Sequence, residues 1–401
     1  MQRQLRLFLT ATLIDALGSG IWIPFGLLFL VHGQGFGLVE AGAALSTGGL
    51  LALTTGPLAG AAMDRFGPRT LLIAGNLLRL AAFGCYPLLT SAWQVVAVTL
   101  VAGVGDRLFW TCNAPMVAAL TTGRDAERVL GTQTVGRFAG AGAGAAASAV
   151  LPEITSPAAF HLIAYANAAT FAVAAALIWF LPAPARMSEP VSEKDGKRGW
   201  KDVLSDRPYV RFCVTHMAFT LASASKFAIL PILVRDFLHG PQWIAGTAIT
   251  IGTVVVVSCQ NLILRVLASH SRATGLIAAA VLFSASFALL IPVTSVPLRV
   301  ATGLILVTSL TFSVAEAMFA PLSTAAAAEA APRGAEGRAS ALFQLSWGLP
   351  VALAPAVLSF LLSVSGPLLW SCLAGTSLLA VPAVLGLRKT MPIGSSPRVS
   401  A

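Results

Sequence analysis

Seven charged side chains lie inside long apolar stretches of this sequence, where a charge is expensive to place. They are Asp15, Arg79, Asp106, Arg107, Arg137, Lys226 and Glu316. A charge in the middle of a membrane helix costs about 2.5–3.5 kcal/mol or more, so such residues usually face the interior of a helix bundle. They can form a structural network of ion pairs, or line a water-filled cavity that binds protons and a solute. Both interpretations stay open at this point.

The acidic members of this set are candidates for proton coupling. A carboxyl group is neutral more readily when buried, and charged more readily beside a cation. A carboxylate that alternates between such surroundings takes up and releases a proton. Arginine stays charged and cannot cycle in this way. Asp15 and Glu316 are therefore the better candidates, and Asp106 is a third.

The basic members, Arg79, Arg107, Arg137 and Lys226, are candidates for contact with a solute or the cavity. Arg107 directly follows Asp106. Neighbouring residues of a helix point about 100° apart, so these two cannot face the same direction. Lys226 is either an anchor for the solute or a counter-ion for an acidic group.

The elements that position these residues must be membrane helices. The 401 residues are 56% hydrophobic and only 10% charged, whereas soluble domains carry about 25% charged residues. The formal charge of +10 is scattered over short segments between apolar stretches, so no nucleic-acid surface is expected. The bilayer is the expected surrounding of the chain.

No residue pattern indicates an enzyme, a metal site or a cofactor. The five cysteines fall inside apolar stretches without paired metal or redox spacing. His161 and His216 each stand alone on an apolar helix, and there is no phosphate-binding Gly-x4-Gly-Lys-Ser/Thr sequence. We therefore expect neither a cofactor nor ATP-driven pumping by this chain.

Twelve stretches are long enough to cross a bilayer core of about 30 Å, which takes roughly 20 apolar residues as a helix. They are 7–31, 38–63, 70–90, 93–120, 130–151, 158–181, 208–234, 243–267, 272–293, 297–320, 339–363 and 366–387. If the N-terminus is cytoplasmic, the opposite face receives only Arg235 and Arg299 of the loop Lys and Arg residues. This bias predicts that both termini are cytoplasmic.

The chain divides into two similar parts. We predict an N-terminal six-helix bundle over 1–185, a charged cytoplasmic linker over 186–207, a C-terminal six-helix bundle over 208–387 and a cytoplasmic tail over 388–401. An Ala-Pro dipeptide followed by a charged loop recurs in the fourth and tenth spans, at Pro115 and Pro321. Recurrence at corresponding positions indicates a parallel duplication. Within the linker, Trp200 to Leu204 is a candidate interfacial helix.

The segment that joins the second and third spans carries the most specific pattern: Gly60, Asp64, Arg65, Gly67 and Arg69. Asp64 lies where a carboxylate opposes the dipole of its own helix. We therefore expect it to have a compensating partner elsewhere, in a contact that latches the two bundles in one state. The alternative is a charged turn that only sets the topology.

This pattern, together with the plan of twelve spans and a central loop, resembles the major facilitator superfamily. The first span, with Asp15, Gly18, Gly20 and Pro24, is similar to the opening helix of its drug exporters. The resemblance implies two bundles around a central cavity that opens to each side in turn, and a gating role for Asp64 and Arg65. Arg107 falls where many proton-coupled members carry an arginine.

The leading hypothesis is a monomeric secondary transporter in the cytoplasmic membrane that exports a small organic solute in exchange for protons. One alternative is a proton-coupled uptake carrier for an organic anion or metabolite, because the basic residues give the cavity region an excess of positive charge. Another is a membrane scaffold or sensor that transports nothing and needs no protonatable cavity group.

Overall fold

The computed structural model describes residues 2–22, 25–120, 157–181, 200–267, 269–332 and 335–391, and residues 133, 136, 139, 140 and 142. Every regular element in this part of the chain is a helix, as the need to satisfy the backbone in lipid requires. Nine of the described helices are long and apolar enough to cross a membrane. Most of the predicted span 130–151 lies outside the described residues, so the count of twelve stays a prediction.

The helices of the first part of the chain begin and end close to the predicted bounds. They are α1 (Gln2–Trp22), α2 (Gly26–Leu28) with the π-helical turn η1 (Phe29–Gly33), α3 (Leu38–Leu53), α4 (Gly56–Phe66), α5 (Pro68–Cys85), the 3-10 turn η2 (Tyr86–Leu88), α6 (Ala92–Leu120) and α8 (Pro157–Trp179). The predicted span 38–63 consists of two helices, α3 and α4. The break precedes Pro57, which lacks the N–H that a continuous helix would use.

The second part of the chain follows the predicted spans in the same way. Its helices are α9 (Trp200–Ser205), α10 (Arg207–Ile232) with the π-helical turn η4 (Leu233–Phe237), α11 (Trp243–Leu267), α12 (Arg272–Leu290), the 3-10 turn η5 (Val293–Ser295), α13 (Leu298–Glu329), α14 (Glu336–Val364) and α15 (Gly366–Leu387). α13 continues past the predicted end at residue 320. The alanine-rich run after Pro321 favours helix and carries it onward.

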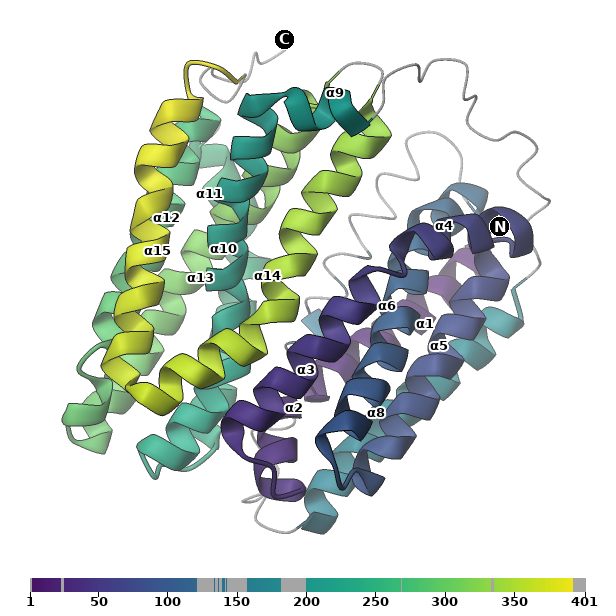
Figure 1. The fold of residues 1–401 in the computed structure, drawn as a ribbon, viewed down its shortest axis with the longest axis horizontal. Helices are drawn as coiled ribbons and strands as arrows, with labels where there is room; N and C mark the ends of the chain where they lie inside the picture. Colours follow the sequence, from purple (N-terminus) through teal and green to yellow (C-terminus); the bar gives the residue numbers. More distant parts are fainter. Residues whose placement is uncertain are drawn as a thin grey trace.

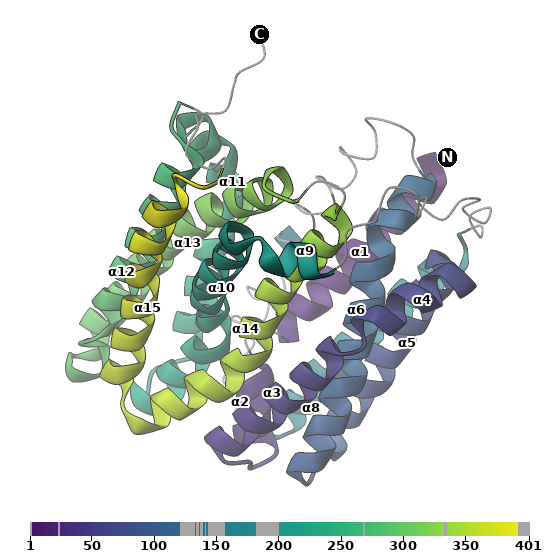
Figure 2. The same cartoon turned by 45° about the horizontal axis from the view of Figure 1, so that its top comes forward.

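Figure 1 shows the described helices in two groups, α1 to α8 on one side and α10 to α15 on the other. The groups meet at the lower end, where α3 packs along α14, and diverge toward the upper end, which carries the N-terminus and α9. We call the lower end the His32 end and the upper end the α9 end. Figure 2 shows α9 lying across the α9 end, where it contacts α10 and α14.

Glycine allows the close contact between α3 and α14. A Cβ atom at Gly42 would lie 2.4 Å from the Pro355 carbonyl oxygen and 2.2 Å from the Ser359 hydroxyl oxygen. One turn further along α3, the Ser46 hydroxyl accepts a hydrogen bond from the Ala356 N–H at 2.9 Å. Small residues at helix crossings permit such an approach in membranes. The contact closes the His32 end of the molecule.

A polar contact joins the two groups at the same end. The His32 ring Nε2 lies 2.7 Å from an Asp236 carboxylate oxygen, and both side chains are partly exposed. His32 belongs to η1 and Asp236 to η4, so the two π-helical turns that end the first and seventh predicted spans contact each other.

Candidate functional site

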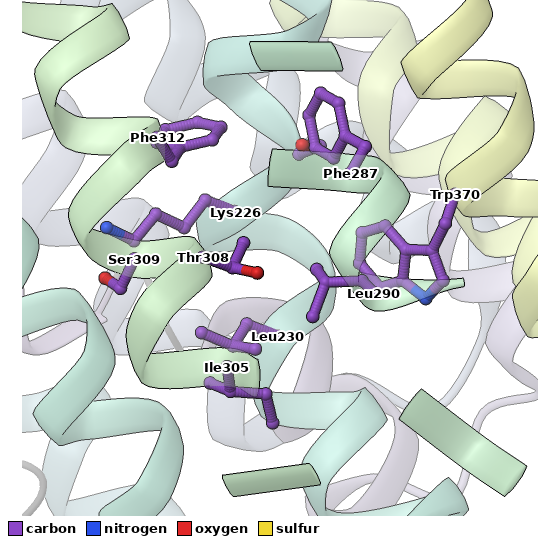
Figure 3. Close-up of a pocket in the computed structure, with 10 residues that line it drawn as sticks. Lys226, Leu230, Phe287, Leu290, Ile305, Thr308, Ser309, Phe312 and Trp370 are labelled. Carbon is purple, nitrogen blue, oxygen red and sulfur yellow. The ribbon is translucent and has the colours of Figure 1, made fainter. Parts of the chain in front are cut away.

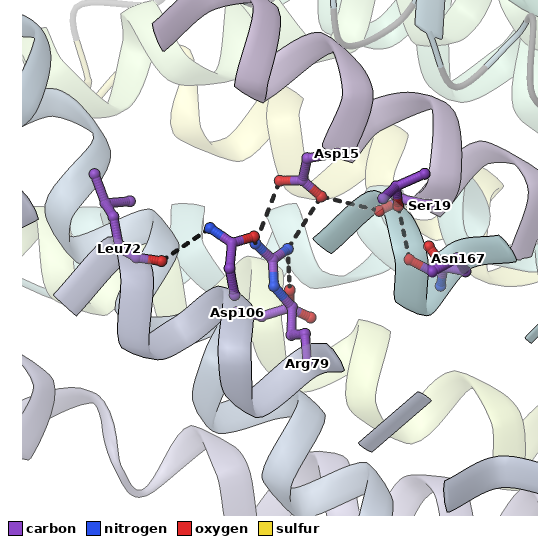
Figure 4. A network of polar contacts seen from close by, with 8 residues as sticks. Asp15, Ser19, Leu72, Arg79, Asp106 and Asn167 are labelled. Atoms are coloured by element: carbon purple, nitrogen blue, oxygen red, sulfur yellow. Dashed lines mark hydrogen bonds and ion pairs between the residues drawn. The ribbon is translucent and has the colours of Figure 1, made fainter. Parts of the chain in front are cut away.

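Three of the predicted intramembrane charges meet inside the first group of helices. The Arg79 guanidinium donates from both terminal nitrogens to Asp15, at 3.2 and 3.3 Å. It also donates to Asp106 at 3.2 Å and to the Asn76 side-chain oxygen at 2.9 Å. Figure 4 shows Arg79 between the two carboxylates, which come from α1 and α6. Two carboxylates from different helices are thus tied to one residue of α5.

The two carboxylates of this network differ in how deeply the protein buries them. Asp15 is 1% exposed and Arg79 3%, whereas Asp106 is 54% exposed. The rings of Phe171 and Phe109 cover Arg79 at 4.3 and 5.4 Å from its guanidinium carbon. Bidentate pairing and cation–π contact both stabilise a buried arginine. Asp15 therefore belongs to a packed ion pair, and Asp106 is the exposed end of the network.

A pair of amides that sequence analysis missed joins α1 and α6, which also supply the two carboxylates of this network. Asn113 and Gln133 donate to each other at 2.9 and 2.7 Å, and Gln133 also donates to the Thr12 hydroxyl at 3.2 Å. All three side chains are buried. Buried amides need such partners. The hydrogen bonds link α1, α6 and the predicted fifth span.

A cavity of about 540 Å³ lies between the two groups of helices. Residues of α1, α2 and α3 line it from one side, and residues of α10, α11, α13 and α14 from the other. Pockets for small molecules typically measure about 300–1,000 Å³ and are mostly apolar, with a few placed polar groups. This cavity fits that description.

Glu316 supplies the charge of the cavity. Among the described residues that line it, Glu316 is the one with an ionisable side chain, and Thr220, Ser223 and Gln260 supply further polar groups. Ser223 donates its hydroxyl to a Glu316 carboxylate oxygen at 2.6 Å. A hydrogen bond to a carboxylate is among the stronger ones in proteins, so the carboxylate is held at the cavity wall. Of the predicted proton-coupling residues, Glu316 is the one placed there.

Two tryptophans form aromatic walls of the same cavity. Trp22 comes from α1 and Trp347 from α14, so each group of helices contributes one. Trp22 packs on Phe83 and Tyr86, with ring centroids 5.0 and 4.6 Å apart. Trp347 stacks parallel to Phe319 at 6.1 Å. These neighbours fix both indoles in place.

Lys226 is one turn of α10 away from Ser223 but does not line this cavity. Its ammonium donates to Ser313 at 3.3 Å and lies 5.3 Å from the centre of the Phe312 ring. Figure 3 shows the amine pointing away from Leu290 and Trp370. These two residues line a small apolar hollow of about 30 Å³ beside the lysine stem. The lysine therefore lies within the second group of helices, between α10 and α13.

The remaining predicted cations are placed differently. Arg107 points toward α14: its terminal nitrogens lie 3.7 and 3.8 Å from where a Cβ atom of Gly348 would be. It thus faces away from Arg79, while the adjacent Asp106 contacts Arg79, as the helical geometry predicts. Arg137 lies outside the described residues.

The segment between the second and third spans forms a tight turn. Gly67 ends α4 with φ +79°, a conformation that favours glycine. Arg69 donates to the backbone carbonyl oxygens of Ile178 and Trp179 at the C-terminus of α8, where a positive charge is favourable. Gly60 lies on α4, Arg65 is exposed over the Phe66 ring, and the Asp64 side chain lies outside the description. The gating role of this segment stays a prediction.

Comparison with known proteins identifies relatives along most of the chain. Residues 7–355 match the family model described as Major Facilitator Superfamily. The chain is 29% identical over 232 residues to the multidrug resistance protein MdtH of Edwardsiella ictaluri, covering 57% of this chain and 56% of that protein. It is 26% identical over 254 residues to MdtH of Klebsiella pneumoniae, covering 62% of this chain and 61% of that protein. The matches thus span less than two thirds of these relatives.

Solved structures share the fold over nearly the whole chain. The nucleoside transporter NupG superposes with a TM-score of 0.72 at 13% identity, covering 96% of this chain and 99% of that chain. A POT family transporter in complex with 5-aminolevulinic acid gives a TM-score of 0.76 at 13% identity, covering 100% of this chain and 97% of that chain. At such low identity these likenesses concern the fold alone.

Proposed function

Because the chain belongs to the major facilitator superfamily, we propose that it is a secondary active transporter that exports a small organic solute through the cavity lined by Glu316. The observation that carries this proposal is the placement of a carboxylate in a cavity of about 540 Å³ between the two groups of helices. Coupling to protons and location in the cytoplasmic membrane are part of the proposal.

The chemistry of the cavity supports a solute with an apolar body and a basic group. Two indoles offer flat apolar surfaces on opposite groups of helices, and Glu316 offers a negative charge near Ser223 and Gln260. Aromatic faces also attract cations. The names of the relatives, multidrug resistance proteins, support export of such compounds.

The arrangement of the helix groups supports an inward-facing state. With the predicted cytoplasmic termini, the α9 end faces the cytoplasm and the His32 end faces outward. The groups are joined at the His32 end by α3 and α14 and by the contact of His32 with Asp236. Rocking of one group against the other about the cavity would then expose it to the outside.

Flux measurement in liposomes tests the proposal. Purified protein is reconstituted, a pH gradient is imposed, and uptake of ethidium and internal pH are recorded together. We expect ethidium movement coupled to proton movement, with Glu316→Gln reducing both by at least about tenfold, a loss of ~1.4 kcal/mol. Glu329→Gln is the matched control, because this carboxylate of α13 is 47% exposed and pairs with Arg272. Wild-type rates in Glu316→Gln would contradict the proposal, and absence of any flux would favour a scaffold.

Uptake of an organic anion has less support. Arg79 is paired with Asp15 and Asp106 inside the first group of helices, and Lys226 contacts Ser313 within the second. Neither belongs to the described lining of the cavity. An anion in the cavity would therefore lie near the Glu316 carboxylate, and neither Arg79 nor Lys226 would offset that negative charge.

A further inference from the structure

Two polar contacts connect α10 with α13 beside the cavity, and we call each of them a rung. On the first, Ser223 of α10 donates to Glu316 of α13 at 2.6 Å. On the second, Lys226 of α10 donates to Ser313 of α13 at 3.3 Å. Each charged residue thus contacts a serine of the opposite helix. Residues three apart on a helix are separated by about 4.5 Å along its axis, so the ammonium lies one rung away from the carboxylate.

The place that holds the ammonium is built for a side chain that can leave it. A Cβ atom at Gly252 of α11 would lie 2.1 Å from the Lys226 nitrogen, so a larger residue there would displace the ammonium. The Phe312 ring lies 5.3 Å from the same nitrogen, and a hydroxyl and a ring bind an ammonium less strongly than a carboxylate does.

From this geometry we infer that Lys226 is a resident cation that competes with the solute for Glu316. While a cationic solute occupies the cavity, the lysine stays on Ser313, Phe312 and Gly252. After the solute leaves, an isolated carboxylate at membrane depth is costly, and Lys226 moves one rung to pair with it. The lysine thereby lowers the affinity for the solute and promotes its release.

The inference deepens the proposed function and rests on it, because it requires a cation at Glu316. The inference distinguishes a competitor from a structural lysine: removal of a competitor strengthens binding of a cation, whereas removal of a structural group destabilises the protein.

Binding of radiolabelled tetraphenylphosphonium to the purified full-length protein in detergent tests the inference. We expect Lys226→Gln to lower the Kd about tenfold, which corresponds to ~1.4 kcal/mol, and Lys226→Arg to leave it near the wild-type value. Thermal unfolding of each variant shows whether the fold is kept. An unchanged or raised Kd in a normally folded Lys226→Gln protein overturns the inference.

Gly252→Ala approaches the same question with the lysine in place. The added methyl displaces the ammonium from its position toward Glu316, so the Kd for tetraphenylphosphonium should rise severalfold. The double variant Gly252→Ala/Lys226→Gln should bind as tightly as Lys226→Gln alone. Gly303→Ala is the matched control, because a Cβ atom there meets no atom within 4 Å. An equal effect of Gly252→Ala with and without the lysine overturns the inference.

Glu316→Gln separates this inference from the proposed function. Loss of binding in Glu316→Gln, combined with an unchanged Kd in Lys226→Gln, would contradict the inference alone. Binding that does not depend on Glu316 would overturn both.

Discussion

Arg79 holds two carboxylates that differ in surroundings, and this difference decides what each residue contributes. Asp15 is 1% exposed and receives two hydrogen bonds from Arg79, whereas Asp106 is 54% exposed and receives one. Removing one partner of a buried pair costs about 3–5 kcal/mol because the other charge stays buried. An exposed pair contributes about 0–1 kcal/mol.

We therefore expect Arg79→Gln to lower the Tm of the purified protein strongly and Asp106→Asn to lower it little. Adding Asp15→Asn to Arg79→Gln should restore part of the loss, because it removes the charge left without Arg79. Thermal unfolding in detergent measures all of these variants. Equal effects of Arg79→Gln and Asp106→Asn would show that Asp15 is not the buried member of a stabilising pair.

The two acidic residues first favoured for proton coupling have different neighbours. Asp15 contacts Arg79 within the first group of helices, and Glu316 faces the cavity beside Ser223. Their coupling roles stay predictions. Sequence analysis could not separate them, because both are acidic residues on apolar helices and pairing depends on which helices become neighbours.

At the scale of the elements, the contact between α3 and α14 holds the two groups of helices together at the His32 end. Gly42 of α3 packs against the Pro355 carbonyl oxygen of α14. This backbone atom cannot move aside as a side chain can. Ser46 joins the same helices and is 3% exposed. A larger residue at Gly42 must separate the helices at the His32 end.

We expect Gly42→Val to open the His32 end. The measurement is the labelling rate of Ser46→Cys by a membrane-impermeant maleimide, in a background without the native cysteines. The rate should rise at least about tenfold over the otherwise wild-type background, as for a shift of ~1.4 kcal/mol in the equilibrium. Gly84→Val is the control, because a Cβ atom there meets no atom within 4 Å. Equal labelling with and without Gly42→Val would show that α3 and α14 do not set the closed state.

At the scale of the whole molecule, a cavity of a size suited to a small solute lies between the two groups of helices. Membership of the major facilitator superfamily confirms the predicted all-α membrane fold and the expectation that the chain is not an enzyme. The domain boundaries and the cytoplasmic position of both termini stay predictions. They rest on the distribution of Lys and Arg and on the charged linker.

Labelling from the two sides of the membrane tests the orientation. Arg299 lies near the start of α13 and Glu329 at its end, and both side chains are exposed. We expect an impermeant maleimide to label Arg299→Cys but not Glu329→Cys on intact cells, and the reverse on inverted membrane vesicles. The opposite pattern would place the termini outside and make the present state outward-facing.

The sequence alone determined the helices, because a bilayer requires long apolar stretches and internally bonded backbone. Predicted spans such as 243–267 and 366–387 agree with α11 and α15 at both ends. The same rule identified the intramembrane charges as residues in need of partners.

Only the tertiary structure decided which partners they have. Arg79 meets Asp15 across 64 positions of the chain, and Ser223 meets Glu316 across 93. Trp22, Trp347 and Gln260 gave no sign in the sequence of lining a cavity, since tryptophan and glutamine on an apolar helix carry no motif. A cavity wall depends on the rotation of each helix about its axis and on its neighbours. Packing between helices fixes both, and the periodicity of one apolar stretch contains neither.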